Sequence, residues 1–191
     1  MQLLGSTTSP FVRRLRLYLV DIEHEFINLD IFSEQGREIL TANNPAQKVP
    51  ALIDGELCVY DSRVIYRYFA EKFSETKLTW EQENLLTLID AANDSFVTLL
   101  LSMRSGIDVE QDVLFYNLQR ERVEKVLSVL AQECEQGAFD TWSYPSICLF
   151  CLLDWIEFRE LYDWKRFPPL YNFYCKSQQR KGIKETDPRI S

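Results

Sequence analysis

The sequence is poor in several residue types, and each shortage excludes a class of protein. It contains a single histidine, His24, in a charged stretch after the first predicted helix, which gives no support for a zinc site or for a histidine-based catalytic triad. Glycine and proline number only 6 and 7 in 191 residues, which excludes collagen-like and low-complexity chains. Basic residues are outnumbered, 21 against 29 acidic residues, and the net charge is −8. An acidic chain lacks the long-range attraction to phosphate backbones, so we expect no nucleic-acid partner.

Long hydrophobic runs are also missing. No apolar stretch reaches the ~18 residues of a membrane span, and the best candidate, residues 147–158, is interrupted by Asp154 and Glu157. The first nine residues contain no Lys or Arg and no long apolar stretch, unlike a secretory signal. Five cysteines without a framework spacing fit reduced thiols. We therefore expect a cytoplasmic protein with no membrane partner.

Residues 1–74 alternate strand and helix patterns. Strands are predicted at residues 2–4, 25–29, 51–53 and 57–60, and helices at residues 11–20, 35–41 and 63–72. Asp54-Gly55, between the last two strands, favours a positive φ and hence a hairpin. The order β-α-β-α-β-β-α is typical of a mixed four-stranded sheet covered by helices.

From residue 80 onward the strand patterns stop. Helices are predicted at residues 80–103, 112–135, 144–159 and 168–180. The third of these is apolar nearly all round, which is typical of a helix at the centre of a bundle, and Ser143 is placed to cap it. The sequence thus predicts an α/β domain at residues 1–74, a linker near residues 73–79, and an all-helical domain at residues 80–191.

The first motif that could carry chemistry lies between the first strand and the first helix. Residues 6–11 read STTSPF, and proline is favoured at the first helical position, so Ser9 lies at or beside the N-cap. The free N–H groups and the positive dipole end of a helix stabilise an anion or thiolate placed there. The alternative is that Ser9 only caps the helix.

The second motif is Lys48-Val49-Pro50, directly before a strand. A cis bond at this proline would turn the Val49 backbone outward and leave its N–H and C=O free to pair with an extended ligand. The alternative is a trans proline that starts an edge strand.

The third motif is Tyr60-Asp61-Ser62, where a strand meets a helix. Ser62 is placed to present its N–H and hydroxyl to a carboxylate, and Asp61 is an acceptor for an ammonium group. The alternative is again an N-cap.

These motifs, in this order, resemble one family. Residues 9–13 (SPFVR), 44–52 (NPAQKVPAL) and 61–65 (DSRVI), together with Tyr68, resemble the thioredoxin-like N-terminal domain of the glutathione S-transferase superfamily. Residues 151–159 (CLLDWIEFR) are similar to its helical C-terminal domain, and the form SPFVR is most similar to bacterial members with a serine-type site. The resemblance implies an α/β thioredoxin-like domain followed by an all-α helical bundle.

The resemblance also implies roles for single residues at the sulfur of glutathione. Ser9 would donate its hydroxyl to the sulfur and act as the catalytic residue, with Thr8 as an alternative donor and Phe11 beside it. A helix N-terminus lowers the pKa of a thiol from roughly 8.5, so that a thiolate is populated at neutral pH.

The rest of the tripeptide would be bound from the neighbouring motifs. Val49 would pair with the cysteinyl backbone, Ser62 would bind the γ-glutamyl carboxylate, and Asp61 would lie near the amine. Lys48 and Gln35 would meet the glycyl carboxylate.

The implied activity is attack of the glutathione thiolate on a small hydrophobic electrophile, in a homodimer. Glutathione would be a co-substrate, with no cofactor or metal. Two alternatives stay open: a non-enzymatic binding protein on the same fold, similar to stringent-starvation regulators, and a glutathione-dependent peroxidase or isomerase. The CxxC spacing of Cys148 and Cys151 lies in an apolar helix and predicts inert core thiols, and Arg13 and Arg14 are expected to be solvated and without a role.

Overall fold

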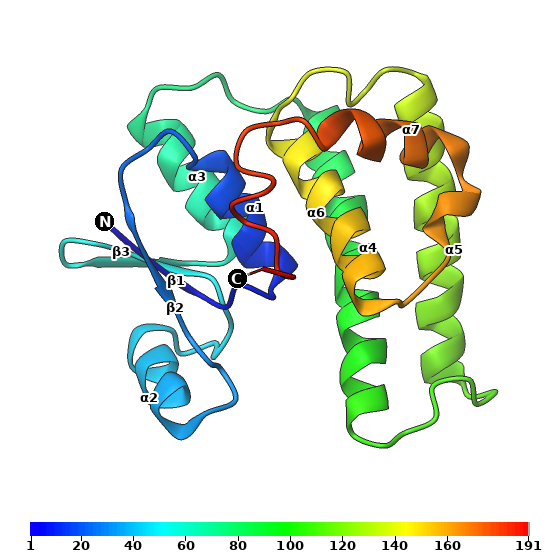
Figure 1. Cartoon of the computed structure of the whole chain (residues 1–191), viewed down its shortest axis with the longest axis horizontal. Coiled ribbons are helices and arrows are strands. Elements are labelled where there is room, and N and C mark those ends of the chain that lie inside the picture. The colour runs from blue at the N-terminus through cyan, green and yellow to red at the C-terminus, as the bar shows by residue number, and fades with distance from the viewer. Residues whose placement is uncertain (191) are drawn as a thin grey trace. The chain divides into compact units, whose positions relative to one another are not determined.

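The computed structural model describes residues 1–190, which form two compact units (Figure 1). The first, here called the α/β unit, contains residues 1–77 and the segment from Gln179 onward. The second, the helical unit, contains residues 78–178. The sequence analysis placed the linker near residues 73–79, and the two units divide between Lys77 and Leu78.

The α/β unit is a mixed four-stranded sheet with helices on both faces. Its elements are β1 (Gln2–Gly5), α1 (Pro10–Tyr18), β2 (Glu25–Asn28), α2 (Glu34–Asn43), β3 (Ala51–Asp54), β4 (Leu57–Tyr60) and α3 (Ser62–Lys72). The strand order is β2-β1-β3-β4; β1 is parallel to β2 and antiparallel to β3, which is antiparallel to β4. The fold class predicted from the strand and helix patterns is confirmed.

Side chains alternate between the two faces of this sheet, as they do in any strand. Leu4 and Ala51, opposite each other in the register, point to the face that Leu40 of α2 covers. Leu3 and Leu52 point the other way, to the face on which α1 and α3 lie (Figure 1). The two helices that begin at the candidate motifs therefore share one face of the sheet.

The start of α1 lies close to β1 because Gly5 has no side chain. A Cβ atom at Gly5 would lie 2.5 Å from Cγ2 of Val12, and Val12 is fully buried. This approach fixes the first turn of α1 against the end of β1.

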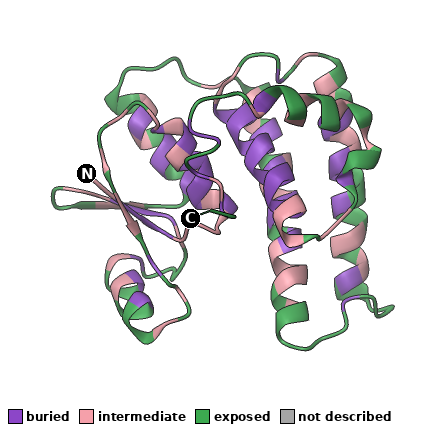
Figure 2. Ribbon diagram, in the orientation of Figure 1, coloured by how far each residue is buried: buried purple, intermediate pink, exposed green. Residues whose placement is uncertain are grey.

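The helical unit is built around one central helix. Its elements are α4 (Trp80–Arg104), α5 (Leu114–Glu135), α6 (Tyr144–Arg159), the 3₁₀ helix η1 (Trp164–Arg166) and α7 (Pro168–Ser177). α6 is buried along most of its length (Figure 2) and packs against α4 and α7, as its uniformly apolar sequence predicted.

The start of α6 differs from the expectation that Ser143 caps it. Ser143 occupies the N-cap, but its side chain makes no capping hydrogen bond. Its Oγ lies 3.4 Å from Oγ of Ser146, which donates to the carbonyl of Thr141 at 2.6 Å. Pro145 removes one of the two N–H groups that an N-cap side chain can bind.

One helix in the described chain, α4, is long and apolar enough to cross a membrane by length and composition alone. The sequence analysis placed its best candidate in residues 147–158 instead. In the structure α4 packs against α5 and α6, and the core helix of a bundle meets the same test of composition.

The segment from Gln179 onward belongs to the α/β unit and not, as predicted, to the helical domain. Gly182 adopts a φ of +85° against the end of α1 and the turn after it, where a Cβ atom would lie 3.1 Å from Cδ2 of Leu17 and 2.9 Å from Cγ2 of Val20. Lys181 forms an ion pair with Asp21 just beyond α1. Periodicity in residues 168–180 extended the last helix toward this segment, but the contacts that hold the segment come from α1.

The main link between α1 and this segment is a buried arginine. Arg13, 3% exposed, donates from Nη2 to the carbonyl of Ile183 at 3.0 Å and from Nε to Oγ1 of Thr186 at 3.2 Å. Thr186 in turn donates to the carbonyl of Gly182 at 2.7 Å. These bonds tie residues 182–186 to the first turns of α1.

Replacing Arg13 by methionine should release this segment. The variant leaves two buried acceptors without their donor, at a cost of about 1–3 kcal/mol in the free energy of unfolding. Limited proteolysis with mass spectrometry should show faster cleavage within residues 179–190, and urea denaturation should show the loss of stability. Arg67→Met, at an exposed position on α3, is the control. Equal cleavage rates in the two variants would contradict the role given to Arg13.

Candidate functional site

The three sequence motifs meet at one edge of the sheet. Leu4 of β1 is opposite Ala51 of β3, and Ala51 is opposite Tyr60 of β4. Because β1 and β4 are both antiparallel to β3, they end where β3 begins. The turn at residues 6–10, the Val49–Pro50 junction and the start of α3 therefore lie at the same edge.

Ser9 is the N-cap of α1, and Pro10 is the first residue of the helix. The Ser9 Oγ accepts a hydrogen bond from the N–H of Val12 at 3.4 Å, which is long for such a bond. Ser9 therefore caps α1, which is the capping role that the sequence analysis gave as the alternative. This bond uses an oxygen lone pair, so the cap leaves the hydroxyl proton available, and within residues 1–190 that proton has no acceptor.

Thr8 and Phe11 flank Ser9 and make different contacts. Oγ1 of Thr8 lies 3.2 Å from Oγ of Ser6, and either hydroxyl can be the donor of this bond. The ring of Phe11 lies against the guanidinium of Arg14, 4.8 Å from the ring centroid. The choice between Ser9 and Thr8 as the hydroxyl donor to a ligand therefore stays a prediction.

The Val49–Pro50 peptide bond is cis, and β3, which follows it, is an inner strand, so the edge-strand alternative is wrong. Asn44, 1% exposed, holds the preceding turn: its Nδ2 donates to the carbonyl of Lys48 at 2.6 Å, and its Oδ1 accepts from the N–H of Ala46 at 2.9 Å. The sequence analysis missed this role of Asn44. In the chain up to residue 190, the N–H and C=O of Val49 have no hydrogen-bond partner.

Lys48 and Gln35 are exposed, and no contact within residues 1–190 brings them together. Gln35 lies in the first turn of α2, after the N-cap Ser33. The contact between α2 and the turn before Pro50 comes instead from Arg37, whose Nη2 donates to Oε1 of Gln47 at 3.2 Å. A role for Lys48 and Gln35 at a carboxylate stays a prediction.

The start of α3 combines a capping carboxylate with a buried hydroxyl. Asp61 is the N-cap, and its Oδ1 accepts from the N–H groups of Arg63 at 2.8 Å and Val64 at 3.4 Å. Its φ of +75° is rare for a residue other than glycine, and such strain is concentrated at functional sites. Ser62 is 3% exposed, and its Oγ accepts from Nη1 of Arg14 at 3.5 Å.

The burial of Arg13 and Arg14 corrects the sequence analysis, which placed them on a solvated surface without a role. They are 3% and 0% exposed. Arg14 reaches from α1 to the start of α3, so a buried positive charge lies next to a helix end whose dipole is also positive. Both effects favour an anion at this point. No pattern in the sequence distinguishes these arginines from Arg16 on the same helix.

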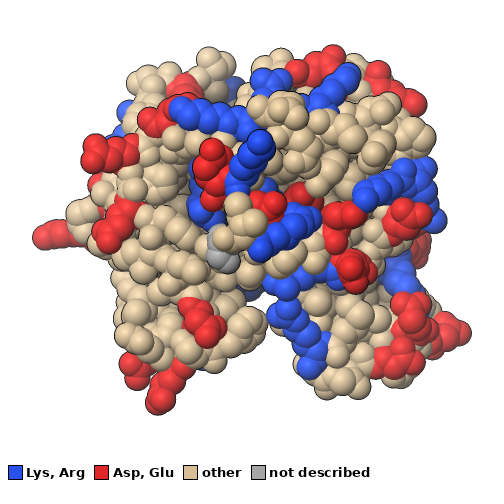
Figure 3. All heavy atoms as spheres, in the orientation of Figure 1, with Lys and Arg blue, Asp and Glu red and all other residues tan. Residues whose placement is uncertain are grey.

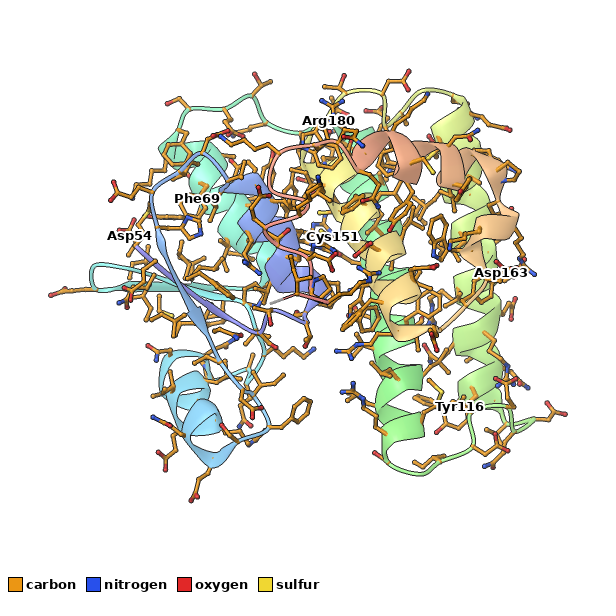
Figure 4. All side chains as sticks on the ribbon, in the orientation of Figure 1. Asp54, Phe69, Tyr116, Cys151, Asp163 and Arg180 are labelled. Atoms are coloured by element: carbon orange, nitrogen blue, oxygen red, sulfur yellow. The ribbon has the colours of Figure 1, made fainter. Side chains whose placement is uncertain are left out.

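Tyr68, part of the motif that carries the family resemblance, has a structural contact in the α/β unit. Its hydroxyl donates to Oδ2 of Asp54 at 2.5 Å, and Lys72 forms an ion pair with the same carboxylate. These hydrogen bonds lower the pKa of Asp54, that from Lys72 most. They tie the last turns of α3 to the β3–β4 hairpin, where Figure 4 labels Asp54.

The cysteines lie outside this site. Cys148 and Cys151 are fully buried in α6 (Cys151 is labelled in Figure 4), as expected for core thiols. Burial raises the pKa of Cys134 to about 12, helped by the negative charges of Asp140 and Glu133. A thiolate at neutral pH is therefore not expected at Cys134.

A hollow of about 740 Å³ lies at the opposite edge of the sheet. It is lined by residues that precede or begin β1 and β2 and by the β3–β4 hairpin: Met1, Gln2, Glu23, His24, Glu25, Ile53 and Gly55. His24 there holds its Nδ1 2.7 Å from the carbonyl of Ile22. Within residues 1–190 no group of three or more His, Cys, Asp or Glu side chains is arranged to hold a metal ion.

The sheet order, the cis-proline junction and the helix that begins beside it define a thioredoxin-like α/β unit, here combined with a helical unit. The model of the family "Glutathione S-transferase, N-terminal domain" matches residues 3–77. The GST-like protein YibF of Escherichia coli is 31% identical over 177 residues, which cover 84% of each chain. The chain therefore belongs to the glutathione S-transferase superfamily, as its motifs indicated.

Two further relatives extend the similarity along the chain. Glutathione S-transferase 2 of Onchocerca volvulus is 26% identical over 178 residues, which cover 90% of this chain and 84% of the relative. The crystal structure of a glutathione S-transferase from Methylobacillus flagellatus, with GSH bound, is 25% identical and covers 98% of both chains, with a TM-score of 0.85. The predicted architecture is thus that of known glutathione S-transferases.

Proposed function

We propose that this protein is a glutathione transferase that activates the thiolate of glutathione for attack on a small hydrophobic electrophile. The observation that carries the proposal is the meeting, at one sheet edge, of two helix N-termini, a buried arginine and a backbone segment without hydrogen-bond partners. An extended tripeptide with two carboxylates and a thiol fits this combination of groups.

Each part of the edge would bind a different part of glutathione. The N–H and C=O of Val49 would pair with the cysteinyl backbone, as an added strand does. Ser62 would bind the γ-glutamyl carboxylate, with Arg14 beneath it, and Asp61 would accept from the amine through the oxygen that does not cap α3.

Ser9 would act on the sulfur without forming a covalent bond to it. Its hydroxyl would donate a hydrogen bond to the thiolate, and the N-terminus of α1 would stabilise the negative charge of the sulfur. The thiol proton would leave to solvent. The thiolate would then form a C–S bond at the electrophilic carbon, and the leaving group would depart with its bonding electron pair.

Glutathione binding tests the proposal directly. Ser62→Ala removes a hydrogen bond to a charged group, worth about 1.5–3 kcal/mol, so the Kd for glutathione should rise at least about tenfold. Isothermal titration calorimetry would measure it. Thr76→Ala, an exposed position in the α/β unit, should leave the Kd unchanged.

The outcomes separate the proposal from its alternatives. If millimolar glutathione neither raises the melting temperature nor gives heat on titration, the proposal is rejected. Binding without conjugation of an activated aryl chloride would favour the non-enzymatic binding protein. Exposed apolar side chains on β4 and α3, namely Leu57, Tyr60 and Val64, support the further proposal of a homodimer, which light scattering would test. A cytoplasmic location is proposed from the reduced cysteines.

A further inference from the structure

The segment at residues 182–188, here called the brace segment, lies along α1 within the α/β unit (Figure 1). Its Ile183 and Thr186 are only 4% and 5% exposed, whereas Lys184 and Glu185 between them are exposed. Figure 3 shows acidic and basic side chains interspersed over the face on which this segment lies. The brace segment is therefore packed against the protein on one side and exposed to solvent on the other.

The brace segment is hydrogen-bonded to α1 at two levels. Nη2 of Arg16 donates to the carbonyl of Glu185 at 3.3 Å, in an exposed bond. Nearer the start of the helix, Arg13 donates to the carbonyl of Ile183 and to Oγ1 of Thr186, and both of these bonds are buried. The buried contact of the segment is thus made with the first turn of α1.

The same arginine is bonded to the N-cap of α1 through its backbone. The N–H of Arg13 donates to the carbonyl of Ser9 at 3.0 Å. Thr186 is itself held in place, because its Oγ1 accepts from Arg13 and donates to the carbonyl of Gly182 at 2.7 Å. Consecutive hydrogen bonds therefore join Thr186, Arg13 and Ser9, from the brace segment to the residue that caps α1.

The Ser9 hydroxyl depends on this support because its own capping bond is weak. Its Oγ lies 3.4 Å from the N–H of Val12, beyond the usual range of such bonds. The backbone of the first turn of α1 therefore determines where the hydroxyl lies. A donor to a reacting atom is sensitive to its position, since a misplacement of about 1 Å can lower a rate about a hundredfold.

We propose that Thr186 and Arg13 are positioning residues, which hold Ser9 where its hydroxyl donates to the thiolate of glutathione. This role rests on the proposed function and adds to it a residue that lies 173 positions from Arg13 in the sequence. Neither residue is proposed to touch the tripeptide, and both act through Ser9.

Thr186→Val keeps the shape of the side chain and removes the hydroxyl, so Nε of Arg13 loses an acceptor. Misalignment of Ser9 should raise the pKa of bound glutathione by about half a unit, toward the ordinary value for a thiol. Less thiolate is then present below that pKa, so kcat/KM should fall about threefold near pH 6.5. At about pH 9.5 the thiolate is formed in both proteins and the rates should be almost equal. The thiolate absorbance of the bound tripeptide and the pH dependence of the rate measure the shift.

Three further variants serve as rescue, replacement and control. Thr186→Ser keeps the hydroxyl and should restore the wild-type pKa. Arg13→Lys keeps the positive charge but lacks the planar fork that reaches both acceptors, so it should raise the pKa as Thr186→Val does. It also keeps the test valid if Thr186→Val does not fold. Lys184→Gln, at an exposed position in the brace segment, should leave the pKa and the rate unchanged.

A double variant shows whether the effect passes through Ser9. In the Ser9→Ala background Thr186→Val should shift the thiol pKa much less, because the hydroxyl that Thr186 positions is absent. An equal shift in both backgrounds would overturn this inference alone, and so would wild-type pKa values in both Thr186→Val and Arg13→Lys. A wild-type protein that binds no glutathione would instead reject the proposed function, and this inference with it.

Discussion

Ser9→Ala is expected to lower kcat/KM for conjugation by roughly 10²–10³, the effect of removing one preorganised donor to a developing or fixed negative charge. The hydroxyl stabilises the thiolate, so its loss should raise the pKa of bound glutathione toward the ordinary value of roughly 8.5. Activity should therefore be lost most at neutral pH and recover partly as the pH rises past the raised pKa. The pH dependence of the rate, and the thiolate absorbance of the bound tripeptide, measure this shift.

Two matched variants separate chemistry from capping. Ser9→Thr keeps a hydroxyl at the N-cap and should keep most of the activity. Thr8→Val tests the neighbouring hydroxyl, which already lies 3.2 Å from Oγ of Ser6, and should change the rate little. Because the Ser9 cap bond is long, at 3.4 Å, Ser9→Ala should cost at most about 1 kcal/mol of stability. If Thr8→Val abolishes activity and Ser9→Ala does not, the assignment of Ser9 is wrong.

Gly5→Ala is expected to give the largest loss of stability among small substitutions in the α/β unit. The new Cβ would lie 2.5 Å from Cγ2 and 2.6 Å from Cγ1 of Val12, both in the packed contact between β1 and α1. Overpacking of this kind costs about 1–3 kcal/mol or more. Urea denaturation should show a lower midpoint, and glutathione binding should weaken because the start of α1 is displaced.

The double variant Gly5→Ala/Val12→Ala provides the decisive comparison. Val12→Ala alone opens a cavity, at a cost of about 1–3 kcal/mol. In the double variant the added methyl occupies part of the space that Val12 leaves. The double variant should therefore lose less stability than the sum of the losses of the two single variants. Strictly additive losses would show that the contact of Gly5 with Val12 is not what fixes the first turn of α1.

Most of the fold could be predicted because its signals are local. The hairpin at Asp54-Gly55, the strands on either side and the apolar α6 each depend on residues a few positions apart. The N-caps Ser9 and Asp61 are local in the same sense. The sequence therefore predicted both the order of the elements and two of the helix starts at the candidate site.

The rest depends on contacts between distant parts of the chain. Arg13 is buried by Thr186, which lies 173 residues away, and Arg14 reaches Ser62, 48 residues away. A helix that carries three arginines is read from its sequence as solvated, since nothing local indicates what covers it. Lys48 and Gln35 differ again: no contact within residues 1–190 brings them together, and their role at a carboxylate stays a prediction.

The return of residues 179–190 to α1 makes the helical unit an insertion within the α/β unit. The ribosome therefore synthesises the helical unit, residues 78–178, before it synthesises residues 179–190 of the α/β unit. A chain truncated after residue 178 would contain the whole helical unit and an α/β unit whose Arg13 lacks Ile183 and Thr186. Removal of residues 179–190 should therefore disturb the structure at the start of α1 rather than that of the helices that precede the removed segment.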